Sequence, residues 1–278
     1  MTASEIKAVA RLDLGEVLRS RWLPFCIGAY AVLGGIFVFV GMRESSVLGF
    51  TGMGRVLFSL CHVLVLVLPL LALLATGQVV NRARDDGTLE LLFSNPISRT
   101  SYLVGVTVVR LVALAAPLVV VLAGLGLVGS LVVGQAVPWA FLLHSIAVGI
   151  ALLAAFVGLG VLTSVRVRQP ARATTVLLLV WASGVLLLDL AGIALLLQWR
   201  LPAEGVFALA AANPVQAARM ALLSSAEPTL STLGPVGFYL ATRVGTTALL
   251  ALGIVWPLCV GIVSWLFAWR SFRRGDVV

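Results

Sequence analysis

The sequence predicts an all-α integral membrane protein with six transmembrane helices. Of its 278 residues, 61% are hydrophobic and only 11% are charged, whereas a soluble domain carries roughly 45–50% apolar and about 25% charged residues. So few charges cannot cover a water-exposed surface, and most of the surface must therefore face lipid. A helix needs about 20 apolar residues to cross the bilayer, and the chain contains six such segments.

The apolar segments give the order of the expected spans, which are 22–42, 57–80, 103–133, 138–165, 173–199 and 245–270. The third is too long for one crossing, because a helix rises about 1.5 Å per residue. Its first turns, up to Arg110, are therefore expected to project beyond the membrane. Together these segments indicate one transmembrane domain over residues 1–278.

The distribution of Lys and Arg predicts the orientation. The N-terminal segment and the connections after the second, fourth and sixth spans hold thirteen of the 19 basic residues, whereas the opposite connections hold five. An excess of basic residues marks the cytoplasmic side of a membrane, so both termini are expected in the cytoplasm. The formal net charge of +8 is thus explained by membrane topology, and no nucleic-acid partner is expected.

Two segments outside the spans are expected to be helical. Residues 4–20 form an amphipathic pattern typical of a helix lying in the membrane interface, with an apolar face of Ile6, Ala10, Leu14, Val17 and Leu18. In the outer connection, 200–244, Asn213 followed by Pro214 is typical of an N-cap and a first helical position. The short helix after them, through about Leu223, is expected to lie against the outer membrane face or to dip into it.

Catalytic and metal-binding motifs are missing from the sequence. A phosphate-binding loop of the GxxxxGK[ST] type needs a lysine, and the only lysine, Lys7, has no glycine frame before it. The HExxH and GxSxG motifs are absent as well. The three cysteines, Cys26, Cys61 and Cys259, lie singly in apolar runs and are interpreted as packing residues. We therefore expect no catalytic site, metal or other cofactor in this chain.

Ionisable residues within the spans are candidates for a polar site, because a charge in lipid is costly. Asp189 lies in the fifth segment, His144 in the fourth and His62 in the second, all in the expected outer half. They could form a polar site that faces the outer leaflet, or they could make ordinary hydrogen bonds between helices. The fourth segment also carries small residues at helical spacing, which predict close packing on another span or on a second subunit, namely Ala147, Ala151, Ala154, Ala155 and Gly158.

The loop 81–102 after the second span is the longest and most polar connection on the expected cytoplasmic side. Its centre predicts one or two turns of helix over Thr88–Phe93, which Asn95 and Pro96 end. Leu89, Leu92 and Phe93 share a face of that helix, opposite Glu90. A short rigid knob with an apolar face suits docking into a groove on another protein.

This loop resembles the coupling region of permease subunits of type-two ABC exporters. The matching positions are Gly87, Thr88, Leu89, Glu90, Leu91, Leu92, Pro96, Ile97, Ser98 and Arg99, with Asp85 and Asp86 where the family often has Glu. The resemblance implies that residues Asp85, Asp86, Gly87, Thr88, Leu89, Glu90, Leu91, Leu92 and Phe93 contact a cytoplasmic ABC ATPase. It also implies a homodimer in the cytoplasmic (inner) membrane with two ATPase subunits, which bind the ATP and Mg.

Within that family, the chain is most similar to the permeases that act with a periplasmic accessory protein in copper-site maturation of nitrous oxide reductase. The similarity rests on overall length, on the stretch Leu188-Asp189-Leu190 and on Asn213-Pro214. Three alternatives stay open. They are an exporter permease for a small molecule, lipid or peptide such as an antibiotic, a scaffold that transmits motion without transport, and an intramembrane enzyme that uses Asp189 with a histidine.

Overall fold

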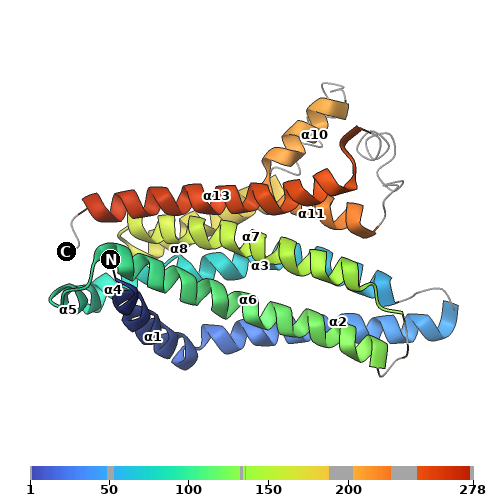
Figure 1. Cartoon of the computed structure of the whole chain (residues 1–278), viewed down its shortest axis with the longest axis horizontal. Coiled ribbons are helices and arrows are strands. Elements are labelled where there is room, and N and C mark those ends of the chain that lie inside the picture. Colours follow the sequence, from blue (N-terminus) through green and yellow to red (C-terminus); the bar gives the residue numbers. More distant parts are fainter. Residues whose placement is uncertain are drawn as a thin grey trace.

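The computed structural model describes residues 2–48, 53–131, 134, 136–187, 203–226 and 243–275. Within these residues the regular structure is helical, and long helices lie side by side in a bundle (Figure 1). The elements are α1 (Ala3–Arg19), α2 (Trp22–Leu48), α3 (Met53–Thr76), α4 (Val79–Asp85), α5 (Thr88–Phe93), α6 (Arg99–Leu131), α7 (Trp139–Arg166), α8 (Pro170–Ala182), the π-helical turn η1 (Ser183–Leu187), α10 (Ala203–Ala212), α11 (Pro214–Ala226) and α13 (Thr246–Arg274).

At least four helical stretches in the described part of the chain are long and apolar enough to cross a membrane. They are Leu57–Asp85, Arg99–Leu131, Trp139–Arg166 and Thr246–Arg274, which correspond to the predicted second, third, fourth and sixth spans. The predicted first and fifth spans contain shorter apolar helical stretches, Trp22–Ile36 and Pro170–Leu186. Residues 188–199 of the predicted fifth span, including Asp189, lie outside the described residues.

The second span and the loop after it are built differently from the prediction. The chain bends at Gly77 and Gln78, and α4 then continues as a helix to Asp85, so the first part of the predicted loop is helical. The backbone N–H of Val80 donates a hydrogen bond of 2.8 Å to the hydroxyl of Ser164 on α7. At the bend, a side chain on residue 77 would collide with Leu177 of α8, so glycine lets α3 and α8 approach closely.

The small residues of α7 pack against α13 within the same chain. A side chain on Gly158 would collide with the backbone of Gly261, and a Cβ on Gly261 would lie 2.6 Å from the carbonyl oxygen of Ala154. Helices approach this closely only where both carry small residues. The structure therefore identifies α13 as a neighbour of this stripe, and α7 also contacts α3, α6 and α11.

The helix after Asn213 begins as predicted and packs within the bundle. The Asn213 Oδ1 accepts a hydrogen bond of 3.0 Å from the backbone N–H of Val215, and its amide donates one of 2.7 Å to the carbonyl of Gly184. This helix, α11, packs against α7 and α13 in the bundle, with Val215, Ala217, Ala218 and Ala221 buried. Its small apolar side chains let it fit between the longer helices.

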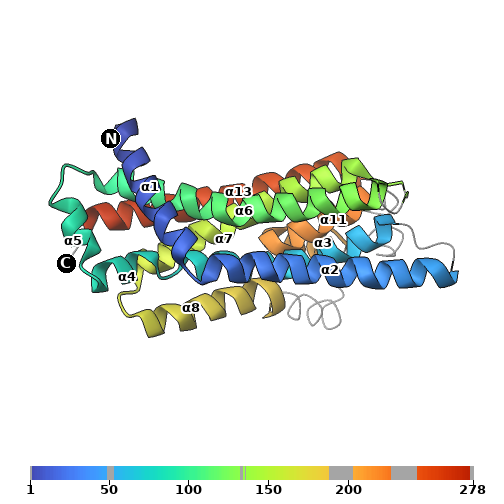
Figure 2. The ribbon, with the colours of Figure 1, turned by 90° about the horizontal axis from the view of Figure 1, so that it is seen from below.

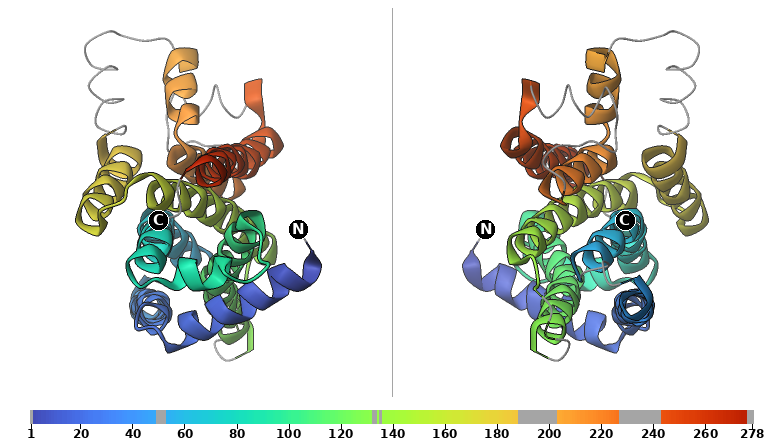
Figure 3. Two further views of the ribbon diagram at one scale, coloured as in Figure 1. Left: turned by 90° about the vertical axis from the view of Figure 1, so that its left-hand side faces the viewer. Right: turned by 90° about the vertical axis from the view of Figure 1, so that its right-hand side faces the viewer.

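The N-terminal helix α1 crosses the end of the bundle, as the end-on views show (Figure 3). Its first turn is capped by Thr2, whose hydroxyl accepts from the backbone N–H of Glu5 at 3.4 Å. The side that packs on the bundle carries Val9, Asp13 and Val17. Leu14 and Leu18 of the predicted apolar face are 44% and 65% exposed. Of the predicted apolar face, Val17 thus packs on the bundle and Leu14 and Leu18 point away from it, while a buried ion pair turns Asp13 toward α6.

Candidate functional site

The predicted docking segment lies at the end of the bundle that also holds α1 and the C-terminal end of α13 (Figure 2). Gly87 connects α4 to α5 with a φ of 69°, a left-handed backbone conformation that glycine adopts without a steric penalty. The helix α5 then occupies Thr88–Phe93, the range expected from the sequence. The turn at Gly87 is sharp enough to make this segment a compact projection.

The outward face of α5 is not the apolar face expected from the sequence. Leu89 is completely buried, and Leu92 and Phe93 are half-buried against the protein's own core. Leu91 is instead 71% exposed, and Glu90 is exposed beside it. The expected docking face therefore holds α5 onto its own bundle, and the exposed side chains of this segment include Leu91, Glu90, Asp85 and Asp86.

Three aromatic rings fix α5 to two long helices. The ring centroid of Phe93 lies 6.0 Å from that of Tyr102 on α6 and 6.3 Å from that of Phe272 on α13. The centroids of Tyr102 and Phe272 are 5.9 Å apart. Such distances lie in the range in which aromatic rings attract one another. The helix α5 is thus packed directly on α6 and α13.

Arg99, the first residue of α6, binds the C-terminal end of α13. Its guanidinium donates to the carbonyl oxygens of Phe272, Arg273 and Gly275 at 3.4, 3.2 and 2.9 Å. The last carbonyls of a helix have no partner within the helix and carry partial negative charge. A cation at this place therefore caps α13 and ties it to the segment that follows α5.

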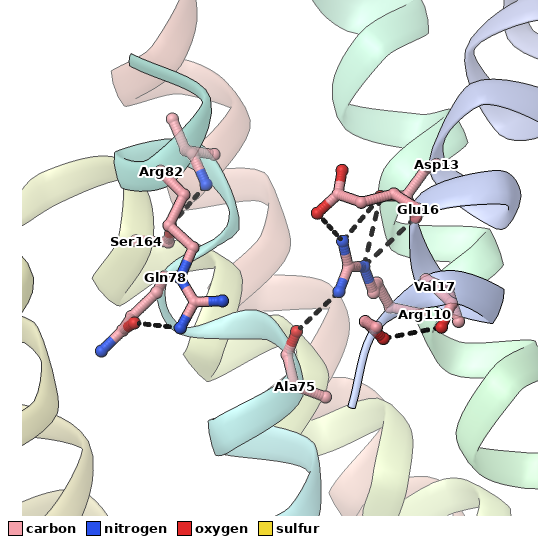
Figure 4. Close-up of polar contacts among 10 residues, drawn as sticks. Asp13, Glu16, Val17, Ala75, Gln78, Arg82, Arg110 and Ser164 are labelled. Carbon is pink, nitrogen blue, oxygen red and sulfur yellow. Dashed lines mark hydrogen bonds and ion pairs between the residues drawn. The ribbon is translucent and has the colours of Figure 1, made fainter. Parts of the chain in front are cut away.

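Among the described residues, the most buried charges are those of Asp13 and Arg110, which join α1 to α6 (Figure 4). The Arg110 guanidinium donates to Asp13 through Nε, at 3.3 and 3.2 Å, and through Nη2, at 2.8 Å. It also lies 3.3 Å from a carboxylate oxygen of Glu16, 3.4 Å from the carbonyl of Ala75 on α3, and 5.3 Å from the Trp22 ring centroid. The side chains of Arg110 and Asp13 are only 4% and 5% exposed, so each charge depends on the other.

Burial raises the pKa of the Asp13 carboxyl above its ordinary value, and the hydrogen bonds from Arg110 oppose that rise. Arg110 lies three turns into α6. The sequence places it at the expected membrane boundary and does not indicate its partner. A lone arginine in an apolar segment and an aspartate on an amphipathic helix are signals from which this pair could have been suspected.

A second polar contact holds the other end of α1. The carboxylate of Glu5 accepts hydrogen bonds from the hydroxyl of Ser101 at 2.8 Å and from the backbone N–H of Ser98 at 3.2 Å. The hydrogen bond from Ser101 makes the largest contribution to lowering the pKa of Glu5 to about 2, and those from Thr2 and Ser98 add to it. The carboxylate is therefore ionised at neutral pH and binds the N-terminal turn of α6.

The structure describes two of the three residues proposed for a polar site within the spans. The His62 Nδ1 lies 3.4 Å from the carbonyl oxygen of Phe58 one turn earlier, and their ring centroids are 4.3 Å apart. The His144 Nδ1 lies 3.1 Å from the hydroxyl of Ser225 on α11. Each histidine thus contacts a different neighbour, and Asp189 lies outside the described residues.

The described residues offer no ready metal centre. No three or more side chains of His, Cys, Asp and Glu among them are grouped so that they could hold a metal ion. Of the free cysteines, Cys26 and Cys61 are buried and Cys259 is exposed.

Comparison with known proteins identifies the family. Residues 7–277 match the model of the ABC-2 family of transporter proteins, which covers nearly the whole chain. The chain belongs to this family. It is a multi-pass membrane permease subunit of an ABC transporter, has no catalytic activity of its own, and works with a separate ATPase subunit. Permeases of this family typically carry no cofactor of their own.

Two curated relatives are similar to this permease. A probable ABC transporter permease protein NosY of Stutzerimonas stutzeri is 30% identical over 287 aligned residues, which cover 98% of this chain and 99% of the relative. A protein of the same description from Pseudomonas aeruginosa is 31% identical over 97 residues, or 35% of each chain. The full-length match supports the resemblance to the family over the whole bundle, beyond the short segment around α5.

Proposed function

We propose that residues Asp85–Phe93 of the permease contact the ATPase subunit and transmit ATP-driven motion into the spans. In this proposal the chain crosses the cytoplasmic (inner) membrane six times and keeps both termini in the cytoplasm. Two copies form a homodimer above two ATPase subunits, which bind the ATP and Mg.

The observation that carries the proposal is the contrast between Leu89 and Leu91 on α5. Leu89 is completely buried and holds the helix on the bundle, whereas Leu91 is 71% exposed. Glu90, Asp85 and Asp86 of the same segment are exposed as well. An exposed leucine among carboxylates fits an apolar socket with a basic rim on the partner, because charges of opposite sign favour the correct encounter.

The contacts behind α5 support its role as a transmitter. Phe93 touches Tyr102 of α6 and Phe272 of α13, and Arg99 binds the end of α13. A force on α5 therefore reaches two candidate spans through packed side chains, without passing through a long flexible loop.

Copurification of the ATPase with variants of Leu91 tests the contact. Burying a leucine side chain is worth about 1.5–3 kcal/mol, so Leu91→Asp should weaken ATPase binding at least about tenfold. The matched variant Leu91→Met keeps an apolar side chain of similar volume and should retain the ATPase. Leu89 is unsuitable for this test, because replacing a fully buried leucine disturbs the permease itself.

Thermal unfolding of the same purified variants provides the control. Leu91 is mostly exposed, so both variants should unfold within a degree or two of the wild type. If Leu91→Asp unfolds normally and still copurifies with the ATPase as the wild type does, the docking role of this segment is wrong.

We further propose that the permease acts, like NosY, in the maturation of a periplasmic copper enzyme, nitrous oxide reductase, together with a periplasmic accessory protein. The full-length similarity to the NosY protein of Stutzerimonas stutzeri supports this role. Deletion of the gene in its source organism should yield nitrous oxide reductase without its full copper absorption spectrum. An unchanged spectrum would refute this role and favour an exporter of a small molecule, lipid or peptide.

A further inference from the structure

A cavity of about 480 Å³ lies between α1, α4, α5 and α6 at the end of the bundle. Its volume falls within the range of about 300–1,000 Å³ that is typical of small-molecule sites. Charged side chains of both signs line it together with an indole ring, and they are Asp13, Glu16, Trp22, Arg82, Asp86 and Arg110. The cavity therefore combines cationic, anionic and aromatic groups in one place.

Two of these charges are already satisfied within the protein. Arg110 and Asp13 bind each other through three close contacts, and the pair closes one wall of the cavity. Arg82 reaches the cavity from α4, on the facing side (Figure 4). Its guanidinium makes one hydrogen bond among the described residues, of 2.9 Å to Gln78, and a guanidinium has five N–H donors.

The carboxylates in the cavity are also available to a ligand. The side chain of Glu16 is 70% exposed and touches Arg110 through one oxygen at 3.3 Å. Asp86 follows α4 and is exposed. The cavity thus presents one available cation, Arg82, and two available anions, Glu16 and Asp86, and a bound group would need both signs of charge to match them.

Apolar side chains flank the cavity. Leu12 of α1 is 62% exposed and Leu74 of α3 is 49% exposed, and both line it. Leu74 lies in a candidate span, Leu57–Asp85, so this side of the cavity is at the boundary between lipid and water. The indole N–H of Trp22 is buried and has no acceptor among the described residues. Tryptophan is frequent at this depth, where its ring is apolar and its N–H is polar.

We propose that this cavity binds the head group of a phospholipid that carries a primary ammonium group, such as phosphatidylethanolamine. Its phosphate would bind Arg82, and its ammonium would face the carboxylates of Glu16 and Asp86. The acyl chains would lie along Leu12 and Leu74. The inference requires that the chain spans a membrane. The site shares Asp86 with the segment proposed to contact the ATPase, so binding is first measured on the permease alone.

The charge pattern selects this head group over the other common ones. A purely anionic head group, as in phosphatidylglycerol, would bring no cation to Glu16 and Asp86 and would be repelled by them. A choline head group carries a positive charge but no N–H donor for the carboxylates. Hydrogen bonds to charged groups are about twice as strong as neutral ones, so the ammonium donors should decide the preference.

Native mass spectrometry of the full-length chain in detergent tests the proposal. The protein is titrated with phosphatidylethanolamine, phosphatidylglycerol and phosphatidylcholine of identical acyl chains. Phosphatidylethanolamine should bind about tenfold more tightly than the other two. Arg82→Ala should weaken its binding about tenfold, and the double variant Glu16→Gln with Asp86→Asn should abolish its advantage. The matched control is Arg172→Ala, an exposed arginine of α8 that does not line the cavity, and it should bind as the wild type does.

Four results would overturn the proposal. The first is equal or tighter binding of phosphatidylglycerol or phosphatidylcholine. The second is an equal loss in Arg82→Ala and Arg172→Ala, which would indicate a diffuse charge effect. The third is competition by soluble glycerophosphoethanolamine at the concentration of the lipid, which would indicate a soluble ligand. The fourth is loss of phosphatidylethanolamine when the ATPase subunit binds, which would assign the cavity to the protein interface.

Discussion

Replacing Arg110 by methionine tests whether the buried ion pair holds α1 on the bundle. Methionine keeps much of the apolar stem but leaves Asp13, whose side chain is 5% exposed, without its partner. Removing one member of a buried pair costs about 3–5 kcal/mol. The lost hydrogen bond to the Ala75 carbonyl, 3.4 Å long, adds about 1 kcal/mol. The variant should therefore lose about 4–6 kcal/mol, equivalent to a fall of roughly 10 °C in the unfolding temperature.

The double variant Arg110→Met with Asp13→Leu distinguishes the cost of an unpaired buried charge from the cost of lost packing. It leaves neither charge buried, and apolar replacement of a buried pair is often neutral. Its unfolding temperature, measured in detergent by differential scanning fluorimetry, should therefore lie well above that of Arg110→Met alone. If the two substitutions instead lower it additively, or if Arg110→Met lowers it by less than about 2 °C, the ion pair does not stabilise the contact of α1 with α6.

The remaining predictions concern glycines and a helix cap. Gly158→Val should lower the unfolding temperature strongly, because its side chain would collide with Gly261, whereas Gly124→Val should change it little, because a Cβ there has no neighbour within 4 Å. Gly87→Ala should cost about 1–2 kcal/mol in the unfolding free energy, since Gly87 has a positive φ, and an Asn at this position should cost less. Arg99→Ala should speed hydrogen exchange in the last turn of α13, whose carbonyls it binds, while exchange in the middle of α7 stays unchanged.

The long helices could be predicted from the sequence because lipid imposes one simple requirement on them. Twenty or more apolar residues in a row leave few structures other than a spanning helix, and α3, α6, α7 and α13 overlap the segments so identified. The start of α11 was also predictable from local residues alone, because the Asn213 side chain caps the helix and the Pro214 ring fixes a helical φ.

The faces of the short helices could not be predicted, because neighbours distant in sequence decide them. In α5, hydrophobicity alone does not distinguish Leu89 from Leu91, and contact with the core buries only the first. In α1, the pattern of apolar residues predicts that Asp13 faces water. In the structure Asp13 is buried, because it pairs with Arg110, 97 residues later in the chain. The need for a glycine at position 77 likewise comes from a distant residue, Leu177 of α8, which a side chain there would meet.

The backbone contact between α7 and α13 restricts how this permease can change shape. Where Gly158 meets Gly261, no side chains separate the two helices, so sliding or rotation would bring larger side chains of one helix against the backbone of the other. They should therefore move together as one rigid pair during a transport cycle, and relative movement should occur where helices meet through longer side chains. Spin labels on these two helices should keep a constant separation in every nucleotide state of the ATPase.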